Sequence, residues 1–141
     1  MTSPDPLVGT VRPGRGLATG LMAEPELQDW FAELAGFPIV PGTLNMRLPG
    51  PLERGPSWRY VPAADIRPDW EARTGQAGYF LASVLIEGRY RGLAFQADER
   101  IKPGYPADQI ELMSEVHLRD ALGLGDGDPI KLSVLPVLYS Q

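Results

Sequence analysis

Proline and glycine interrupt this chain so often that only short helices and strands fit between them. The 141 residues include 16 glycines and 15 prolines. Proline lacks the N–H group that a helix interior or a central strand uses, and glycine adopts turn conformations that are closed to other residues. Prolines also break up residues 49–78, so the sequence leaves the structure of that stretch open. The chain is therefore expected to fold as short elements joined by many turns.

The rest of the composition is that of an ordinary globular domain. Hydrophobic residues make up 43% and charged residues 22% of the chain, which predicts one domain with a real core over residues 1–141. The absence of cysteine excludes disulfides, thiolate metal sites and cysteine nucleophiles. The net charge of -5 and the pI of about 4.8 argue against a general nucleic-acid-binding protein.

Nothing in the sequence indicates a membrane segment or an export signal. No apolar run reaches the roughly 18 residues that a spanning helix needs. Residues 1–6 are polar and lack the basic and apolar regions of a signal peptide. We therefore expect a cytoplasmic protein that has no membrane or nucleic-acid partner and acts as a monomer.

Hydrophobic periodicity predicts six strands and two short helices. The strands are expected at residues 7–11, 44–48, 79–86, 89–95, 108–113 and 130–135. One helix is expected to open at Glu24–Glu26 and to end at Gly36, and the other to run from Glu115 to Leu122 with Ser114 as its N-cap and Gly123 after its end. These elements favour a small, mainly β barrel with helices closing its ends. They do not fit alternating βαβ units.

The stretch 41–48 contains the clearest candidate for a metal site. Pro41 and Gly42 predict a turn, after which Leu44 and Met46 alternate with polar residues. Thr43 and Asn45 therefore share one strand face, where their two neutral oxygens suit Mg²⁺ that arrives with nucleotide phosphates. The alternative is a polar strand face hydrogen-bonded to a neighbouring turn.

A glycine-rich loop at residues 12–20 is the first candidate anion site. Free N–H groups in such a loop can form an anion-binding nest, and Arg15 can add a bidentate phosphate contact. The loop matches neither a P-loop nor the dinucleotide fingerprint. A mobile hairpin is an equally good interpretation of this loop taken alone.

Two further polar positions lie on the later elements. His117 and Arg119 are placed at the start of the second helix, which is either an anion site or an ordinary surface turn. Ile110 and Leu112 are expected to face the core, which turns Glu111 to the opposite, ligand-side face. A carboxylate there can orient or deprotonate an acceptor hydroxyl, or it can be a surface glutamate without a role.

Several motifs follow one another in a characteristic order. They are Gly14-Arg15-Gly16, then Gly36-Phe37, then Pro41-Gly42-Thr43-Leu44-Asn45, then the run 105–112, and then the run 117–128, which ends in Gly125-Asp126-Gly127-Asp128. Together they resemble the archaeal-type CTP-dependent riboflavin kinases over roughly Val8 to Val134. The glycine-rich loop alone is not specific, but the Gly-Thr-Leu-Asn run and the Asp-Gly-Asp ending together are.

The resemblance implies a six-stranded cradle-loop β-barrel that transfers a phosphoryl group from CTP to the ribityl hydroxyl of riboflavin, giving FMN and CDP. It implies that Thr43 and Asn45 hold Mg²⁺ and that Glu111 faces the flavin near the ribityl chain. It implies nucleotide-binding residues in two groups, which are Gly14, Arg15, Gly16, Leu17, Ala18, Thr19 and Gly20, and His117, Leu118, Arg119 and Asp120.

The chain departs from the family pattern at two places. Pro103 stands where the family commonly has a threonine on the flavin side, and proline supplies neither a hydroxyl nor an N–H group. Residues 17–19 also differ from the acidic, glycine and arginine residues of many relatives. Three functions therefore stay open: a riboflavin kinase, a kinase of the same chemistry on another hydroxyl acceptor, and a non-catalytic barrel that binds nucleotide or flavin.

Overall fold

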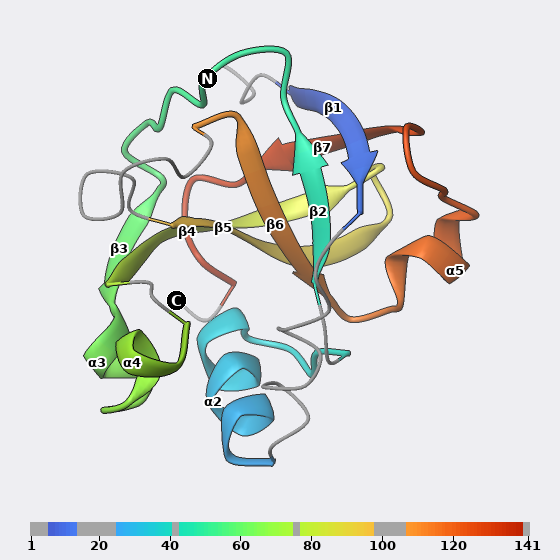
Figure 1. The fold of residues 1–141 in the computed structure, drawn as a ribbon. Coiled ribbons are helices and arrows are strands. Elements are labelled where there is room, and N and C mark those ends of the chain that lie inside the picture. The colour runs from blue at the N-terminus through green and yellow to red at the C-terminus, as the bar shows by residue number, and fades with distance from the viewer. Residues whose placement is uncertain (1–5, 14–24, 41–42, 75–76, 98–106, 140–141) are drawn as a thin grey trace.

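The computed structural model describes residues 6–13, 25–40, 43–74, 77–97 and 107–139 (Figure 1). The elements in chain order are β1 (Pro6–Arg12), α2 (Pro25–Ala35), β2 (Leu44–Arg47), β3 (Arg59–Pro62), α3 (Ala63–Ile66), α4 (Trp70–Thr74), β4 (Gly78–Ile86), β5 (Tyr90–Ala97), β6 (Gln109–Ser114), α5 (Leu118–Leu122) and β7 (Pro129–Val134).

Six antiparallel strands close into a barrel. Their order is β4–β5–β6–β2–β1–β7, and β7 pairs with β4 to complete the ring. The long strand β4 makes the closure possible, because residues 84–86 pair with β7 while residues 78–81 pair with β3 outside the ring. The mainly β, six-stranded barrel expected from the sequence is confirmed (Figure 1).

Two apolar clusters hold the structure together, one on each side of the barrel wall. The barrel core consists of Val11, Leu44, Met46, Leu48, Val84, Ile86, Ala94, Ile110, Leu112, Leu118, Ile130 and Leu132. The outer cluster packs helices α2, α3 and α4 on the outside of the wall and includes Leu27, Phe31, Phe37, Trp70, Tyr79, Leu93, Phe95 and Met113. Neighbouring residues of one strand can thus belong to different clusters, one facing the barrel core and the next facing the outer cluster. A polar residue on the outer side of the wall can therefore be buried next to apolar side chains.

The helices differ from the sequence-based expectation in two ways. The stretch 49–78, which the sequence left open, contains β3 and the short helices α3 and α4. The last helix begins at Leu118 with His117 as its N-cap, so the expectation that Ser114 caps a helix from Glu115 is wrong. Ser114 instead stays in the sheet, paired with Gly92, and its Oγ donates to the Arg91 carbonyl at 2.7 Å.

The glycines expected after both helices do adopt left-handed conformations, with φ of 88° at Gly36 and 64° at Gly123. Such a φ is open to glycine because it has no Cβ, which explains why each helix ends there. No helix within the described residues has the length and apolar character required to cross a membrane.

Candidate functional site

Strands β2 and β6 bring together the polar residues that the sequence marked separately. Asn45 pairs with Glu111 in the register of the two strands. Their neighbours Leu44 and Leu112 point into the barrel core, so Asn45 and Glu111 lie on the outer side of the wall. The structure therefore confirms that Glu111 is turned away from the core, and it adds that Glu111 lies directly beside Asn45.

Hydrogen bonds connect these residues into one polar row. The Thr43 Oγ1 hydroxyl donates to Glu111 Oε1 at 3.4 Å, and Gln109 Nε2 donates to Asn45 Oδ1 at 3.1 Å. We call Thr43, Asn45, Gln109 and Glu111 the polar row. The sequence analysis did not single out Gln109 as a site residue, although the two-residue period of a strand puts it on the same face as Glu111.

The environment of Glu111 changes its acidity. Burial beside the outer cluster, where Phe95 is its pairing partner on β5, raises the pKa of Glu111 from 4.5 to about 7. The hydroxyl of Thr43 lowers that pKa by donating to the carboxylate, but desolvation is the larger effect. A carboxyl group with a pKa of about 7 can hold or release a proton at neutral pH, as a general base requires.

The donor atoms of the polar row suit a hard cation that brings ligands of its own. The residues that the structure describes contain no group of three or more His, Cys, Asp or Glu side chains that could hold a metal ion. Asn45 Oδ1 accepts one hydrogen bond from Gln109 and keeps a second lone pair, and Thr43 offers its hydroxyl oxygen. Such a set fits Mg²⁺ bound mainly by phosphate oxygens and water.

The second group of candidate nucleotide residues lies beside the end of β1. Arg119 Nη2 donates to Asp126 Oδ1 at 2.7 Å and to the Arg12 carbonyl at 3.3 Å. The Asp126–Asp128 turn is also bonded to Val11 through both of that residue's backbone groups, at 2.7 and 2.8 Å. Residues 117–120 therefore lie next to the point where β1 leads toward the glycine-rich loop.

The other candidates of this group differ in exposure. The His117 Nδ1 atom lies 3.2 Å from Asp120 Oδ2, with side-chain exposures of 59% and 85%, whereas Leu118 is buried in the barrel core. Residues 14–20 and Pro103 lie outside the described residues, so the structure does not test their predicted roles.

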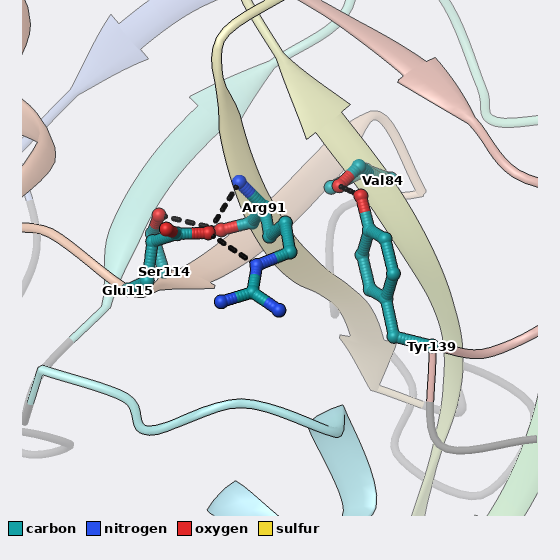
Figure 2. Close-up of polar contacts among 5 residues, drawn as sticks. All are labelled: Val84, Arg91, Ser114, Glu115 and Tyr139. Carbon is teal, nitrogen blue, oxygen red and sulfur yellow. Dashed lines mark hydrogen bonds and ion pairs between the residues drawn. The ribbon is translucent and has the colours of Figure 1, made fainter.

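An ion pair between the start of β5 and the residue just after β6 lies beside the segment that leads into Thr43. Arg91 donates to Glu115 Oε2 from its backbone N at 2.9 Å and from its Nε at 2.7 Å. Ser114 Oγ donates to the Arg91 carbonyl, as Figure 2 shows. These contacts join the start of β5 to the end of β6, close to where β2 begins.

The segment between α2 and β2 packs directly on this ion pair. Val40 N donates to the Ser114 carbonyl at 2.9 Å, and the Phe37 ring lies 4.8 Å from the Arg91 guanidinium and 5.6 Å from the Tyr139 ring. Tyr139 is fixed in turn by its hydroxyl, which donates to the Val84 carbonyl at 3.0 Å (Figure 2). Burial raises the pKa of Tyr139, so the hydroxyl remains a donor at neutral pH.

The geometry defines a class of protein: a closed antiparallel barrel with a carboxylate and two neutral oxygens on its outer wall. Residues 11–134 match the family model labelled CTP-dep_RFKase, which is described as the domain of unknown function DUF120. The match spans most of the chain, and the chain belongs to this family. This result confirms the resemblance that the sequence motifs indicated.

Several archaeal proteins named riboflavin kinase are similar to this chain. The one from Methanococcoides burtonii is 33% identical over 132 residues, and the one from Methanoculleus marisnigri is 34% identical over 137 residues. Each alignment covers 91% of this chain and 56% of the relative, so the chain spans about half the length of these relatives. A riboflavin kinase from Aeropyrum pernix is 32% identical over 112 residues, which are 71% of this chain and 74% of that protein.

Proposed function

We propose that this protein transfers the γ-phosphoryl group of CTP to the terminal ribityl hydroxyl of riboflavin, giving FMN and CDP. The family label and the names of the relatives support this reaction. The observation that carries the proposal is the pairing of Glu111 with Asn45, which sets a carboxylate beside two neutral oxygens. That combination serves a reaction that needs a proton acceptor and a divalent cation at adjacent positions.

Glu111 is the proposed general base. Its carboxylate accepts the proton of the acceptor hydroxyl as the hydroxyl oxygen forms a bond to the γ-phosphorus, and the bond from that phosphorus to the bridging oxygen of CDP breaks. Because Thr43 also donates to this carboxylate, the position of Oε1 is restrained before the acceptor arrives. Positioning and charge neutralisation are the main requirements of phosphoryl transfer, so few catalytic side chains suffice.

The remaining roles are assigned to residues around the polar row. We assign Mg²⁺ binding to Thr43 and Asn45, nucleotide binding to residues 14–20 and 117–120, and acceptor contact to Pro103 together with Glu111. When bound, Mg²⁺ neutralises charge on the phosphates. The same proposal treats residues 1–141 as one barrel domain that acts as a monomer.

A second candidate function is the same chemistry on another hydroxyl acceptor. It is favoured by Pro103, because proline has no hydroxyl or N–H group to offer the flavin at a position where the family pattern described above has a threonine. Riboflavin remains our first choice because the relatives that match most of this chain are named riboflavin kinases.

One assay separates these possibilities. The purified protein is incubated with CTP, MgCl₂ and riboflavin, and FMN is measured by chromatography with fluorescence detection. Reactions without CTP, with EDTA, or with Glu111→Gln in place of the wild type serve as controls. FMN formation that requires CTP, MgCl₂ and the Glu111 carboxyl group supports the proposal. Turnover of CTP only with another acceptor from a panel of alcohols supports the second candidate. Binding of CTP or riboflavin without any turnover would mean a non-catalytic barrel.

A further inference from the structure

A glutamine side chain is completely buried in the barrel wall next to the polar row. Gln96, on β5, has an exposed fraction of 0%. Its Nε2 group donates to the carbonyls of Ala107 and Gln109, at 2.8 and 3.1 Å, and its Oε1 accepts a hydrogen bond from Arg54 Nη1. Both the oxygen and the nitrogen of this buried amide therefore have hydrogen-bond partners. This matters because a buried amide without partners would destabilise the folded protein.

Arg54 comes from the chain between β2 and β3 and is itself fixed in place. Its guanidinium carbon lies 3.8 Å from the centroid of the Phe80 ring, an arrangement typical of a cation–π contact. Phe80 is the pairing partner of Gln96 in the β4–β5 register, so the arginine reaches both residues from one position.

The three partners of Gln96 require the same amide orientation. An arginine guanidinium only donates hydrogen bonds, so the oxygen of the amide must face Arg54. The carbonyls of Ala107 and Gln109 only accept, so the NH₂ group must face them. Arg54 therefore fixes the direction in which Gln96 donates.

The residues that receive these bonds form the entry to β6. The Ala107 carbonyl also accepts from Leu52 N at 3.0 Å, and the Asp108 carbonyl accepts from Leu48 N at 2.7 Å. Gln109 then donates to Asn45, and Glu111 follows two residues later. A displacement of residues 107–109 would therefore also displace Gln109 and Glu111 relative to the rest of the polar row.

We propose that Arg54 and Gln96 are positioning residues for the acceptor side of the reaction. By holding residues 107–109, they keep Gln109 and Glu111 at the correct distance from Asn45 and Thr43. We call this pair the Arg54–Gln96 clamp. The inference rests on the proposed function, but it assigns these residues an effect on the acceptor alone. Of the candidate nucleotide residues, the structure describes residues 117–120, which lie beside the end of β1 and share no hydrogen bond with Arg54 or Gln96.

The first test separates the two substrates kinetically. Gln96→Glu keeps the size of the side chain and an oxygen for Arg54 but removes the NH₂ donor. Arg54→Met leaves Gln96 intact and removes the group that orients it. Both variants should raise the KM for riboflavin at least tenfold and change the KM for CTP less than twofold. Arg54→Lys, which can still donate to Gln96, should recover most of the loss.

A matched control lies at the other end of the same hairpin. Arg89 also packs on an aromatic ring, 5.0 Å from the Tyr90 centroid, and donates to Tyr90 Oη at 3.1 Å, but it has no contact with residues 107–109. Arg89→Met should leave both KM values unchanged. Equal changes in the two KM values for Gln96→Glu and Arg54→Met would overturn the proposal, because a general loss of structure acts on both substrates.

A second measurement does not depend on activity. Hydrogen exchange of the backbone amides in residues 107–111 should be at least tenfold faster in Gln96→Glu and Arg54→Met than in the wild type, while exchange in β1 and β7 stays the same. If the wild type makes no FMN, the proposed function fails, yet this exchange measurement still decides whether the clamp exists. If Gln96→Glu fails to fold, Arg54→Met decides, since it removes no fully buried side chain. Exchange at the wild-type rate in Arg54→Met would overturn the clamp.

Discussion

Glu111 is the residue whose chemistry depends most on its surroundings. Burial raises its pKa to about 7, so a general base at this position is half ionised near neutral pH. We expect the kcat/KM of the wild type for the acceptor, measured with CTP and Mg²⁺ present, to rise with pH through about 7. Glu111→Gln keeps the shape of the side chain, and turnover should fall about a hundredfold or more with CTP affinity intact. A loss of acceptor affinity alone would make Glu111 a binding residue, and an unchanged rate would exclude both roles.

The same pKa shift predicts how stability changes with pH. The folded protein holds the Glu111 proton up to about pH 7, whereas the unfolded chain releases it near 4.5. Stability is therefore lost as the pH rises between these values, because ionised Glu111 is disfavoured only in the folded state. Urea unfolding of the wild type and Glu111→Gln should show the wild type losing up to about 3 kcal/mol relative to the variant between pH 4.5 and 7.5. A constant difference between the two proteins would show that the carboxyl group is not buried as described.

Asn45 provides a separate test of the metal assignment. Asn45→Ala removes one proposed Mg²⁺ ligand and should reduce turnover strongly with little loss of fold, since the lost neutral hydrogen bond contributes only about 1 kcal/mol. Gln109→Leu is the matched control, because it removes the same hydrogen bond but no metal ligand, and its loss of activity should be much smaller. Turnover at the wild-type level in Asn45→Ala would remove Asn45 from the metal site.

The contact between strands β1 and β2 depends on one glycine. A Cβ added at Gly9 would lie 2.4 Å from the Arg47 carbonyl oxygen and 3.0 Å from Met46 Cε, so a side chain there pushes the two strands apart. Gly9→Ala should lower the free energy of unfolding by about 2–3 kcal/mol, as measured by denaturant titration. At Gly50 an added Cβ meets nothing within 4 Å, so Gly50→Ala should stay within about 0.5 kcal/mol of the wild type. Equal effects at the two positions would contradict this account of the strand contact.

We expect the preference for CTP over ATP to be measurable as a difference in how much each nucleotide raises the Tm of the protein. Cytosine presents an amino donor and a carbonyl acceptor that backbone groups near residues 117–120 can read, so CTP should bind in preference to ATP. A ligand at a hundred times its Kd stabilises a protein by about 2.7 kcal/mol, which thermal unfolding detects easily. With Mg²⁺ present, CTP should raise Tm clearly more than the same concentration of ATP. A larger shift with ATP would contradict the assignment.

Local patterns were sufficient to predict much of the barrel. Alternation of Leu44 and Met46 with polar residues identified β2 and its two faces, and the glycines after α2 and α5 marked where those helices end. Prediction failed where distant partners decide the structure. Ser114 has the composition of an N-cap, but its hydroxyl donates to the Arg91 carbonyl and keeps it in β6. The stretch 49–78 could not be assigned, because β3 is a strand only through its pairing with β4.

The order of residues was enough to determine which side chains face away from the barrel core, because that depends only on the two-residue period of a strand. It placed Thr43 with Asn45 and turned Glu111 outward. The distance between these residues depends on the register of β2 against β6, which is set by packing around the closed barrel. The raised pKa of Glu111 and the Arg54–Gln96 clamp follow from burial among segments far apart in sequence. Desolvation and hydrogen bonding act between neighbours in space, so only the tertiary structure decided them.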